Sequence, residues 1–309
     1  MKDFIGFKDI IDGFMKRADK NTLSHAHLIV GPDGIGKSIM ARIFALKILG
    51  KEIDHNYVDM IHYRPKKASF GVDEVREIIE EVTKKPYEGD KKVIIIHEGS
   101  KLTVQAQNAL LKTIEEPPTG VYIILLSESL EIMLDTIKSR CQIYKLTPIE
   151  KDDMIRYISR LGELNEDKIL AALAYGEGIP GRAEKMLKDE NLEKLRSTIV
   201  DLLKDIEKRN SSTVLDYENK FTSYKTEKEE LLNLLASFIR DIMVYKELEN
   251  KNIIINVDRF EDICELANSL SYKKLNSMLE HVKEARVNLM SNTNYSMTIS
   301  VMLIGFLEG

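Results

Sequence analysis

The sequence contains no tryptophan, only two cysteines and no long hydrophobic segment. Cys141 and Cys264 lack the paired spacing of a zinc site, and two cysteines are too few for a disulfide scaffold. No uninterrupted apolar run reaches the roughly 18 residues that a membrane-spanning helix needs. The charges within residues 1–4 also differ from the apolar region of a signal peptide. We therefore expect a cytoplasmic protein in a reducing environment, with no membrane partner.

Proline and glycine are also scarce, at 7 and 16 of 309 residues, whereas hydrophobic residues make up 43% and charged residues 31%. This composition excludes a low-complexity chain and indicates a globular protein with a substantial core. At roughly 150 residues per domain, the length predicts about two domains or three small ones. The net charge of −5 argues against a protein that binds nucleic acid alone through a broadly basic surface.

The first part of the chain alternates apolar runs of strand length with helical patterns. The predicted elements are strands over 25–30, 93–96 and 121–126, and helices over 38–46, 73–82 and 103–115. Continuous apolar strands between helices are typical of a parallel sheet that is covered on both faces. Thr103 is the expected N-cap of the last helix, and Pro117 follows its end. This α/β region is predicted to end near Leu146.

Helical patterns dominate beyond Pro148, interrupted by the glycine-rich stretch 176–181. Residues 253–255 are the one exception, and they fit either a loop or a short extended piece. Within 230–248, apolar residues recur at spacings of three and four and form a broad stripe from Leu231 to Ile242. Such a stripe fits an internal core or a subunit interface.

The strongest chemical signal is Gly31-Pro32-Asp33-Gly34-Ile35-Gly36-Lys37-Ser38, which matches the phosphate-binding P-loop pattern at every fixed position. It follows a predicted strand and opens a predicted helix, as a P-loop does. Its glycines Gly31, Gly34 and Gly36 let backbone N–H groups surround phosphates, and Lys37 reaches the terminal phosphates. Ser38 would ligate Mg²⁺. The sequence therefore predicts a site for ATP or ADP with Mg²⁺.

A P-loop ATPase also needs an acidic residue at a strand end to hold the metal, and many have a following glutamate that polarises water. After the strand over 93–96, the first of these positions is His97 and the second is Glu98. A neutral imidazole removes a negative charge and an oxygen ligand from a Mg²⁺ site. We therefore expect nucleotide binding to survive better than hydrolysis, with Glu98 as the remaining candidate catalytic base.

Several segments together resemble one family, the bacterial DNA polymerase III clamp-loader subunits. They are His25-Ala26-His27-Leu28 before the P-loop, residues 85–89, residues 105–118 and the triplet Ser139-Arg140-Cys141. These segments span the α/β region almost end to end. Residues 178–183 and 292–294 look more like the delta-prime type of subunit than the gamma/tau type.

The resemblance implies a RecA-like AAA+ P-loop domain over 1–147, a helical lid over 148–207 and an all-α collar domain over 208–309. In such complexes a five-subunit ring that includes gamma/tau and delta subunits opens the sliding clamp and places it on primed DNA. The resemblance also implies that Arg140 acts in trans, as an arginine finger toward ATP in the neighbouring subunit. A guanidinium supplies fixed positive charge to a phosphoryl group in transfer.

Three features depart from the family pattern or match it weakly. Residues 51–61 have no cysteine where many relatives insert a zinc module, and so we expect no zinc site. The polar residue expected after the third predicted strand falls at Ser127. Arg182 stands where an arginine of the lid could meet nucleotide, although Pro180 and Gly181 could shift its register.

The preferred interpretation is thus a weakly hydrolysing or non-hydrolysing clamp-loader subunit that acts through Arg140. The alternative is an active gamma/tau-type ATPase in which Lys37, Ser38 and Glu98 catalyse turnover, and His97 argues against it. A stand-alone P-loop kinase is disfavoured, because it would leave Arg140 and the helical C-terminal part without a role.

Overall fold

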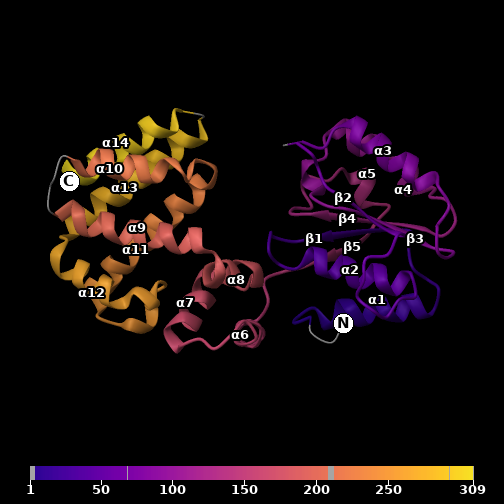
Figure 1. The fold of residues 1–309 in the computed structure, drawn as a ribbon, viewed down its shortest axis with the longest axis horizontal. Helices are drawn as coiled ribbons and strands as arrows, with labels where there is room; N and C mark the ends of the chain where they lie inside the picture. The colour runs from indigo at the N-terminus through magenta and orange to yellow at the C-terminus, as the bar shows by residue number, and fades with distance from the viewer. Residues whose placement is uncertain (1–3, 68, 208–211, 292, 309) are drawn as a thin grey trace. The chain divides into compact units, whose positions relative to one another are not determined.

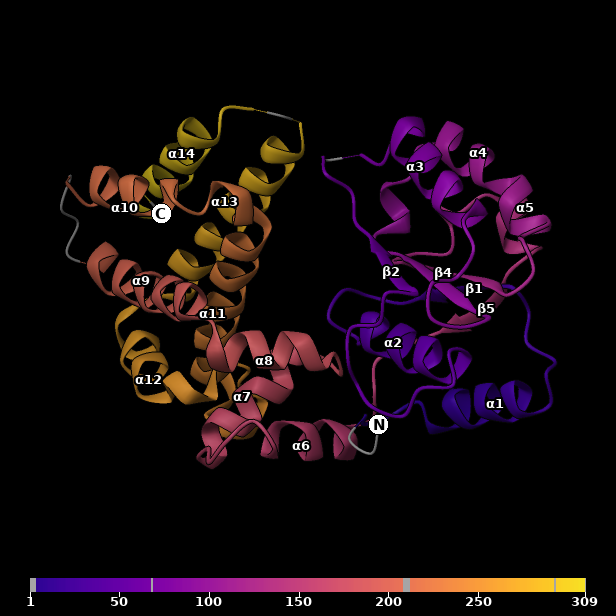
Figure 2. The same ribbon diagram turned by 45° about the vertical axis from the view of Figure 1, so that its right-hand side comes forward.

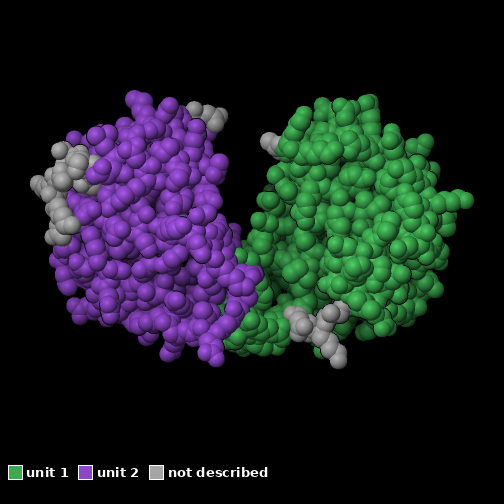
Figure 3. Space-filling view, in the orientation of Figure 1, with its two compact units in different colours: residues 1–160, 178–181 green, residues 161–177, 182–309 purple. Residues whose placement is uncertain are grey.

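The computed structural model describes residues 4–67, 69–207, 212–291 and 293–308. The chain divides into two compact units, shown in Figure 3. Unit 1 comprises Met1–Arg160 and Gly178–Gly181, and unit 2 comprises Leu161–Glu177 and Arg182–Gly309. The three-domain division at residues 147 and 207 stays a prediction.

Unit 1 is built on a five-stranded parallel sheet with the strand order β2–β3–β4–β1–β5 (Figure 1). The strands are β1 (Ala26–Val30), β2 (Met60–Tyr63), β3 (Lys92–Ile96), β4 (Val121–Ser127) and β5 (Gln142–Lys145). Almost every residue of β3, β4 and β1 is buried, because these strands lie inside the sheet and helices cover both of its faces. The predicted parallel α/β architecture is confirmed.

The helices of unit 1 are α1 (Lys8–Asp19), α2 (Lys37–Ile48), α3 (Val72–Thr83), α4 (Val104–Glu115), α5 (Asp135–Lys138) and α6 (Lys151–Ser159), with a 3-10 turn over Gly99–Lys101. Five of these helices cover the sheet, α1 and α2 on one face and α3, α4 and α5 on the other, whereas α6 belongs to neither layer (Figures 1 and 2). Successive strand residues point to opposite faces. Ile29 therefore packs with Phe14 of α1 and Phe44 of α2, whereas Leu28 packs with Val75 of α3 and Leu110 of α4.

The boundaries of α4 follow from its sequence. The hydroxyl oxygen of Thr103 accepts a hydrogen bond from the backbone N–H of Ala106 at 3.2 Å, as an N-cap does. The helix ends at Glu115, before Pro117. Both expectations for this helix are confirmed.

Unit 2 contains helices and short 3-10 turns. Its helices are α7 (Glu166–Gly176), α8 (Pro180–Lys188, from Arg182 onward), α9 (Glu190–Glu207), α10 (Ser212–Thr222), α11 (Lys228–Leu248), α12 (Phe260–Ser269), α13 (Tyr272–Met290) and α14 (Tyr295–Glu308). The side chains of the predicted stripe from Leu231 to Ile242 are buried, and α11 packs against α9, α12 and α13. The stripe is therefore internal core of unit 2.

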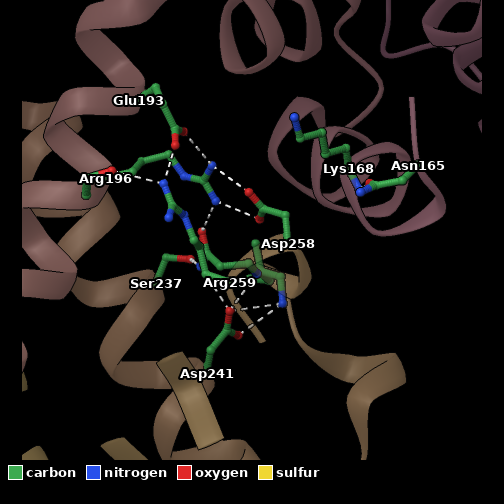
Figure 4. Close-up of polar contacts among 11 residues, drawn as sticks. Asn165, Lys168, Glu193, Arg196, Ser237, Asp241, Asp258 and Arg259 are labelled. Carbon is green, nitrogen blue, oxygen red and sulfur yellow. Dashed lines mark hydrogen bonds and ion pairs between the residues drawn. The ribbon is translucent and has the colours of Figure 1, made fainter. Parts of the chain in front are cut away.

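A buried polar network holds the segment between α11 and α12 in place (Figure 4). Arg196 of α9 is 1% exposed, and its two terminal nitrogens donate to the two carboxylate oxygens of Asp258 at 2.8 and 2.7 Å. Asp241 of α11 accepts hydrogen bonds from the backbone N–H groups of Ile255 and Asn256. Residues 253–255, for which the sequence allowed either a loop or an extended piece, thus form the end of a 3-10 turn and the start of an extended loop that is hydrogen-bonded to α11.

Candidate functional site: the P-loop and its surroundings

The P-loop connects β1 to α2, and each glycine of its pattern has a structural reason. A Cβ on Gly31 would lie 2.5 Å from the carbonyl oxygen of Leu146, which is too close for any side chain. Gly34 and Gly36 have φ angles of 80° and 106°, in the region that favours glycine. The loop therefore has the backbone geometry that lets successive N–H groups face a phosphate.

Lys37 bends back over this loop. Its Nζ donates hydrogen bonds to the carbonyl oxygens of Gly31 at 2.8 Å and Pro32 at 2.9 Å. Burial lowers the pKa of Lys37, and the carboxylate of Asp33, 3.9 Å away and almost fully exposed, opposes that shift only in part. The amine thus spans the mouth of the loop at the place where a P-loop lysine meets phosphate.

Ser38 opens α2 and faces a pair of histidines rather than a carboxylate. The Oγ of Ser38 lies 3.4 Å from Nδ1 of His97, and Nε2 of His97 lies 3.0 Å from Nδ1 of His62. With both rings protonated on Nε2, Ser38 donates to His97 and His97 donates to His62. His97 follows β3 and His62 lies in β2, so that the hydrogen-bonded chain crosses two neighbouring strand ends.

Both histidines are neutral at pH 7. Burial and the positive charge of Arg64 lower the pKa of His97 to about 4. Burial, with Arg42 and Arg64 nearby, also lowers the pKa of His62. Neutral imidazoles at the strand ends supply no carboxylate oxygen for Mg²⁺. The sequence singled out His97, whereas the role of His62 was missed, because the short edge strand that carries it was not recognised from the sequence.

Glu98, the candidate catalytic base at the second acidic position, is paired with Lys101. Its backbone has a positive φ of 52°, and its carboxylate forms an ion pair with Lys101 in the next 3-10 turn. Ser127, at the end of β4, is fully buried. Its carbonyl oxygen accepts from the N–H of Gly31, which places it beside the P-loop, but its hydroxyl donates to the carbonyl oxygen of Ser129 at 2.8 Å. The roles of Glu98 and Ser127 toward nucleotide stay predictions.

Two segments remote in sequence complete the P-loop surroundings within unit 1, and neither was predicted. The N–H of Gly181 donates to the carbonyl oxygen of Gly34 at 2.9 Å. A Cβ on Gly181 would stand 2.7 Å from the Cα of Gly34, so that only glycine fits this contact. Near the N-terminus, the ring of Phe4 lies so close to Gly36 that a Cβ there would be 3.1 Å from the ring.

Arg182 belongs to unit 2 and forms an ion pair with Glu177 at 3.2 Å. Its contact with phosphate stays a prediction. Asn292, part of the late Asn292-Thr293-Asn294 segment, lies outside the described residues.

Arg140 occupies a separate place in unit 1, just after α5. Its Nε is ion-paired with Glu115 at the end of α4, and its Nη1 donates to the carbonyl oxygen of Thr136 at 2.9 Å and to Ser139 Oγ at 3.2 Å. The side chain is 38% exposed. No hydrogen bond or ion pair among the described residues joins Arg140 to the P-loop of its own chain. The guanidinium is therefore fixed on the surface, away from the local site.

Within the described ranges, no group of three or more histidine, cysteine, aspartate or glutamate side chains is arranged to hold a metal ion. Among the same residues, no helix has the length and apolar character needed to cross a membrane. The expectation that the chain carries no zinc stays a prediction.

Comparison with known proteins shows which family the chain belongs to. A family model described as DNA polymerase III, delta subunit, matches residues 6–150, and one described as the C-terminal part of that subunit matches residues 190–307. The delta-prime subunit of DNA polymerase III from Escherichia coli K12 is 32% identical over 241 residues, which cover 77% of this chain and 70% of that subunit. The chain belongs to the DNA polymerase III delta-prime family.

Other relatives agree with membership in the delta-prime family. The Bacillus subtilis delta-prime subunit is 26% identical over 310 residues, covering 94% of this chain and 93% of that subunit. A gamma subunit from Buchnera aphidicola is 31% identical, but only over 51% of this chain. A crystal structure of a gamma subunit-related protein from Thermotoga maritima covers 96% of this chain and 98% of its own, with a TM-score of 0.51 and 15% identity, and so shows the shared fold alone. The delta-prime interpretation is favoured over the gamma/tau one.

Proposed function

We propose that this delta-prime family member works as a largely static subunit of a clamp loader and stimulates ATP hydrolysis in a neighbouring subunit through Arg140. The proposed assembly is a five-subunit ring with gamma/tau and delta subunits that loads the sliding clamp onto primed DNA. Residues 148–207 would act as the lid and residues 208–309 as the collar that joins the ring.

The observation that carries this proposal is the place of Arg140. The Arg140 guanidinium is partly exposed and anchored through Nε and Nη1, and its Nη2 has no hydrogen bond or ion pair among the described residues. An arginine finger needs this arrangement, because it must reach a phosphoryl group of another subunit with little loss of side-chain entropy. Its lack of a bond to the local P-loop supports action in trans.

The local site supports a binding role without catalysis. The P-loop backbone and Lys37 retain what phosphate binding requires. The metal position, however, faces His97, and Glu98 is ion-paired with Lys101. We therefore propose that ATP or ADP binds here with little or no turnover. Mg²⁺, which this family of folds usually holds through the P-loop serine and an acidic strand end, does not fit the residues present.

The test is a complex reconstituted with gamma/tau and delta subunits, the clamp and primed DNA. The Arg140→Ala variant is expected to assemble normally but to slow hydrolysis at the neighbouring site by about 10³-fold, within the range known for arginine fingers. Clamp loading should slow with it. Arg76→Ala, which removes an exposed arginine of α3 whose one ion pair within the described part of the chain is with Asp73, is the matched control. Equal hydrolysis and loading rates for Arg140→Ala and the unmodified complex would refute the proposal.

The intact P-loop also keeps the gamma/tau-type ATPase as a second candidate. ATP hydrolysis by the isolated protein separates the two functions. Binding without turnover fits the static subunit, whereas sustained turnover that is lost in Glu98→Gln would make this chain a motor subunit.

A further inference from the structure

The surroundings of Ser38 differ from a magnesium site in charge as well as in ligand type. Ser38 Oγ is hydrogen-bonded to His97, and His97 to His62, at 3.4 and 3.0 Å. Neither imidazole carries a negative charge, and the nearest acidic strand-end residue, Glu98, is held by Lys101. A Mg²⁺ ion placed beside Ser38 would therefore meet imidazole nitrogen, a poor ligand for a hard cation.

Two arginines, Arg64 and Arg42, lie close enough to the histidine pair for their charges to act on it. The register of β2 and β3 pairs Tyr63 with Ile96, and the N–H of His97 donates to the carbonyl oxygen of Tyr63 at 2.9 Å. The next step of this register sets Arg64 beside His97. Arg64 is exposed, and no hydrogen bond or ion pair involves it among the described residues. Its charge is thus available to a ligand.

Arg42 adds a second, weaker contribution. It lies one helical turn after Ser38 on α2, so that both side chains share a face of the helix. Arg42 is ion-paired with Asp54 and hydrogen-bonded to Asn56, which reduces its free charge. The acceptance of an anion at this site therefore depends more on Arg64 than on Arg42.

The charges near the strand ends compare directly with those of a metal-dependent P-loop. An aspartate with a bound Mg²⁺ carries a net charge of +1. Because His97 replaces the aspartate with a side chain that has no negative charge to offset, the +1 charge of Arg64 matches this value without a metal. The two arrangements thus give similar electrostatic support to the phosphates of a nucleotide.

We propose that this P-loop binds the phosphates of a nucleoside di- or triphosphate without a divalent cation, with Arg64 supplying the positive charge that Mg²⁺ supplies in related sites. This inference rests on the proposed binding of ATP or ADP. Magnesium independence also explains how the chain can keep a complete P-loop and lack the acidic strand end. The bound nucleotide would then be a structural ligand of unit 1.

The test is a titration of the full-length protein with a fluorescent N-methylanthraniloyl derivative of ADP, once with EDTA and once with millimolar Mg²⁺. The dissociation constants are expected to agree within about threefold. Arg64→Gln should weaken binding in EDTA by about tenfold, because a charge-assisted contact is lost. Lys66→Gln, which changes an exposed lysine of the same segment that is paired with Glu77, should leave binding unchanged. His97→Asp should weaken binding in EDTA and restore it in Mg²⁺.

The outcomes separate this inference from the proposed function. Binding that strengthens tenfold or more with Mg²⁺ in the unmodified protein would overturn the inference and leave nucleotide binding intact. Unchanged binding by Arg64→Gln would overturn the role of Arg64, since this exposed residue can be replaced without disturbing the core. No binding under either condition would overturn both the inference and nucleotide binding, whereas the Arg140-dependent hydrolysis by the complex tests the subunit function independently.

Discussion

His27, in the strand that leads into the P-loop, should make the stability of the protein depend on pH. Its side chain is fully buried, with Phe14 at a ring-centroid distance of 5.4 Å, and its Nδ1 lies 3.3 Å from the hydroxyl of Tyr144. Its Nε2 has no hydrogen-bond partner within the described structure. Burial, and to a smaller degree the charge of Arg17, lowers the pKa of His27 from 6.5 to about 4. The folded state therefore holds this imidazole neutral.

The sign and size of the effect follow from proton linkage. Between pH 6.5 and pH 4 the unfolded chain binds a proton at His27 that the folded chain does not, so stability falls as pH falls through this window. The difference of about 2.5 pKa units corresponds to roughly 3 kcal/mol below pH 4 and to about 2 kcal/mol at pH 5. This is a large part of the 5–15 kcal/mol typical of a folded domain.

Urea unfolding followed by circular dichroism between pH 5 and pH 8 measures this dependence. His62 and His97 also contribute to the slope because their pKa values are lowered, and so the comparison is with His27→Leu. That variant removes the titrating group and should reduce the change in unfolding free energy from pH 7 to pH 5 by about 2 kcal/mol. Equal pH dependence in the two proteins would refute the assignment of a buried, neutral His27.

Two further predictions concern the close contact of Gly181 with Gly34 and the buried ion pair of Arg196 with Asp258. Gly181→Ala should destabilise the protein by about 1–3 kcal/mol in urea unfolding, because its Cβ would meet the backbone of Gly34. The control Gly89→Ala, which has open space at the Cβ position, should change stability by less than about 0.5 kcal/mol. Equal effects of the two substitutions would contradict the contact between Gly181 and Gly34. Asp258→Asn should cost about 3–5 kcal/mol in thermal unfolding, since buried Arg196 loses its two-pronged charge partner and keeps the longer ion pair with half-exposed Glu193. Asp262→Asn, at a partly exposed pair with Lys204, should cost less than about 1 kcal/mol. A similar small loss for both aspartates would show that Arg196 finds another partner.

The parts of the fold that the sequence predicted are those with a local cause. The apolar runs of β1, β3 and β4 reflect burial on both faces, and Thr103 with Pro117 marks the ends of α4. The edge strands β2 and β5 were missed. Each is four residues long and partly exposed, and neither sequence, MIHY in β2 or QIYK in β5, is a continuous apolar run that would indicate a strand. Helix α1 was missed as well, because only Phe14 is buried in it.

The candidate site shows the same limit. Lys37 and Ser38 were predicted because a motif places them, and the unusual chemistry at His97 follows from its position after a strand. His62 contacts His97 across 35 positions of sequence, and Gly181 contacts Gly34 across 147, and no local pattern records such distances. The stripe on α11 could be read as core or interface until its packing partners in unit 2 were known.

The contact between Phe4 and Gly36 has a practical consequence for following the P-loop in solution. The chain has no tryptophan, so that an indole introduced by Phe4→Trp would be its sole intrinsic fluorophore of that kind. Its ring would lie against the glycine that precedes Lys37, where the entry of a phosphate group changes the local polarity and the freedom of the ring. With excitation at a wavelength that tyrosine does not absorb, emission from this one residue would report ligand entry in real time, without signal from the tyrosines of the helical C-terminal part.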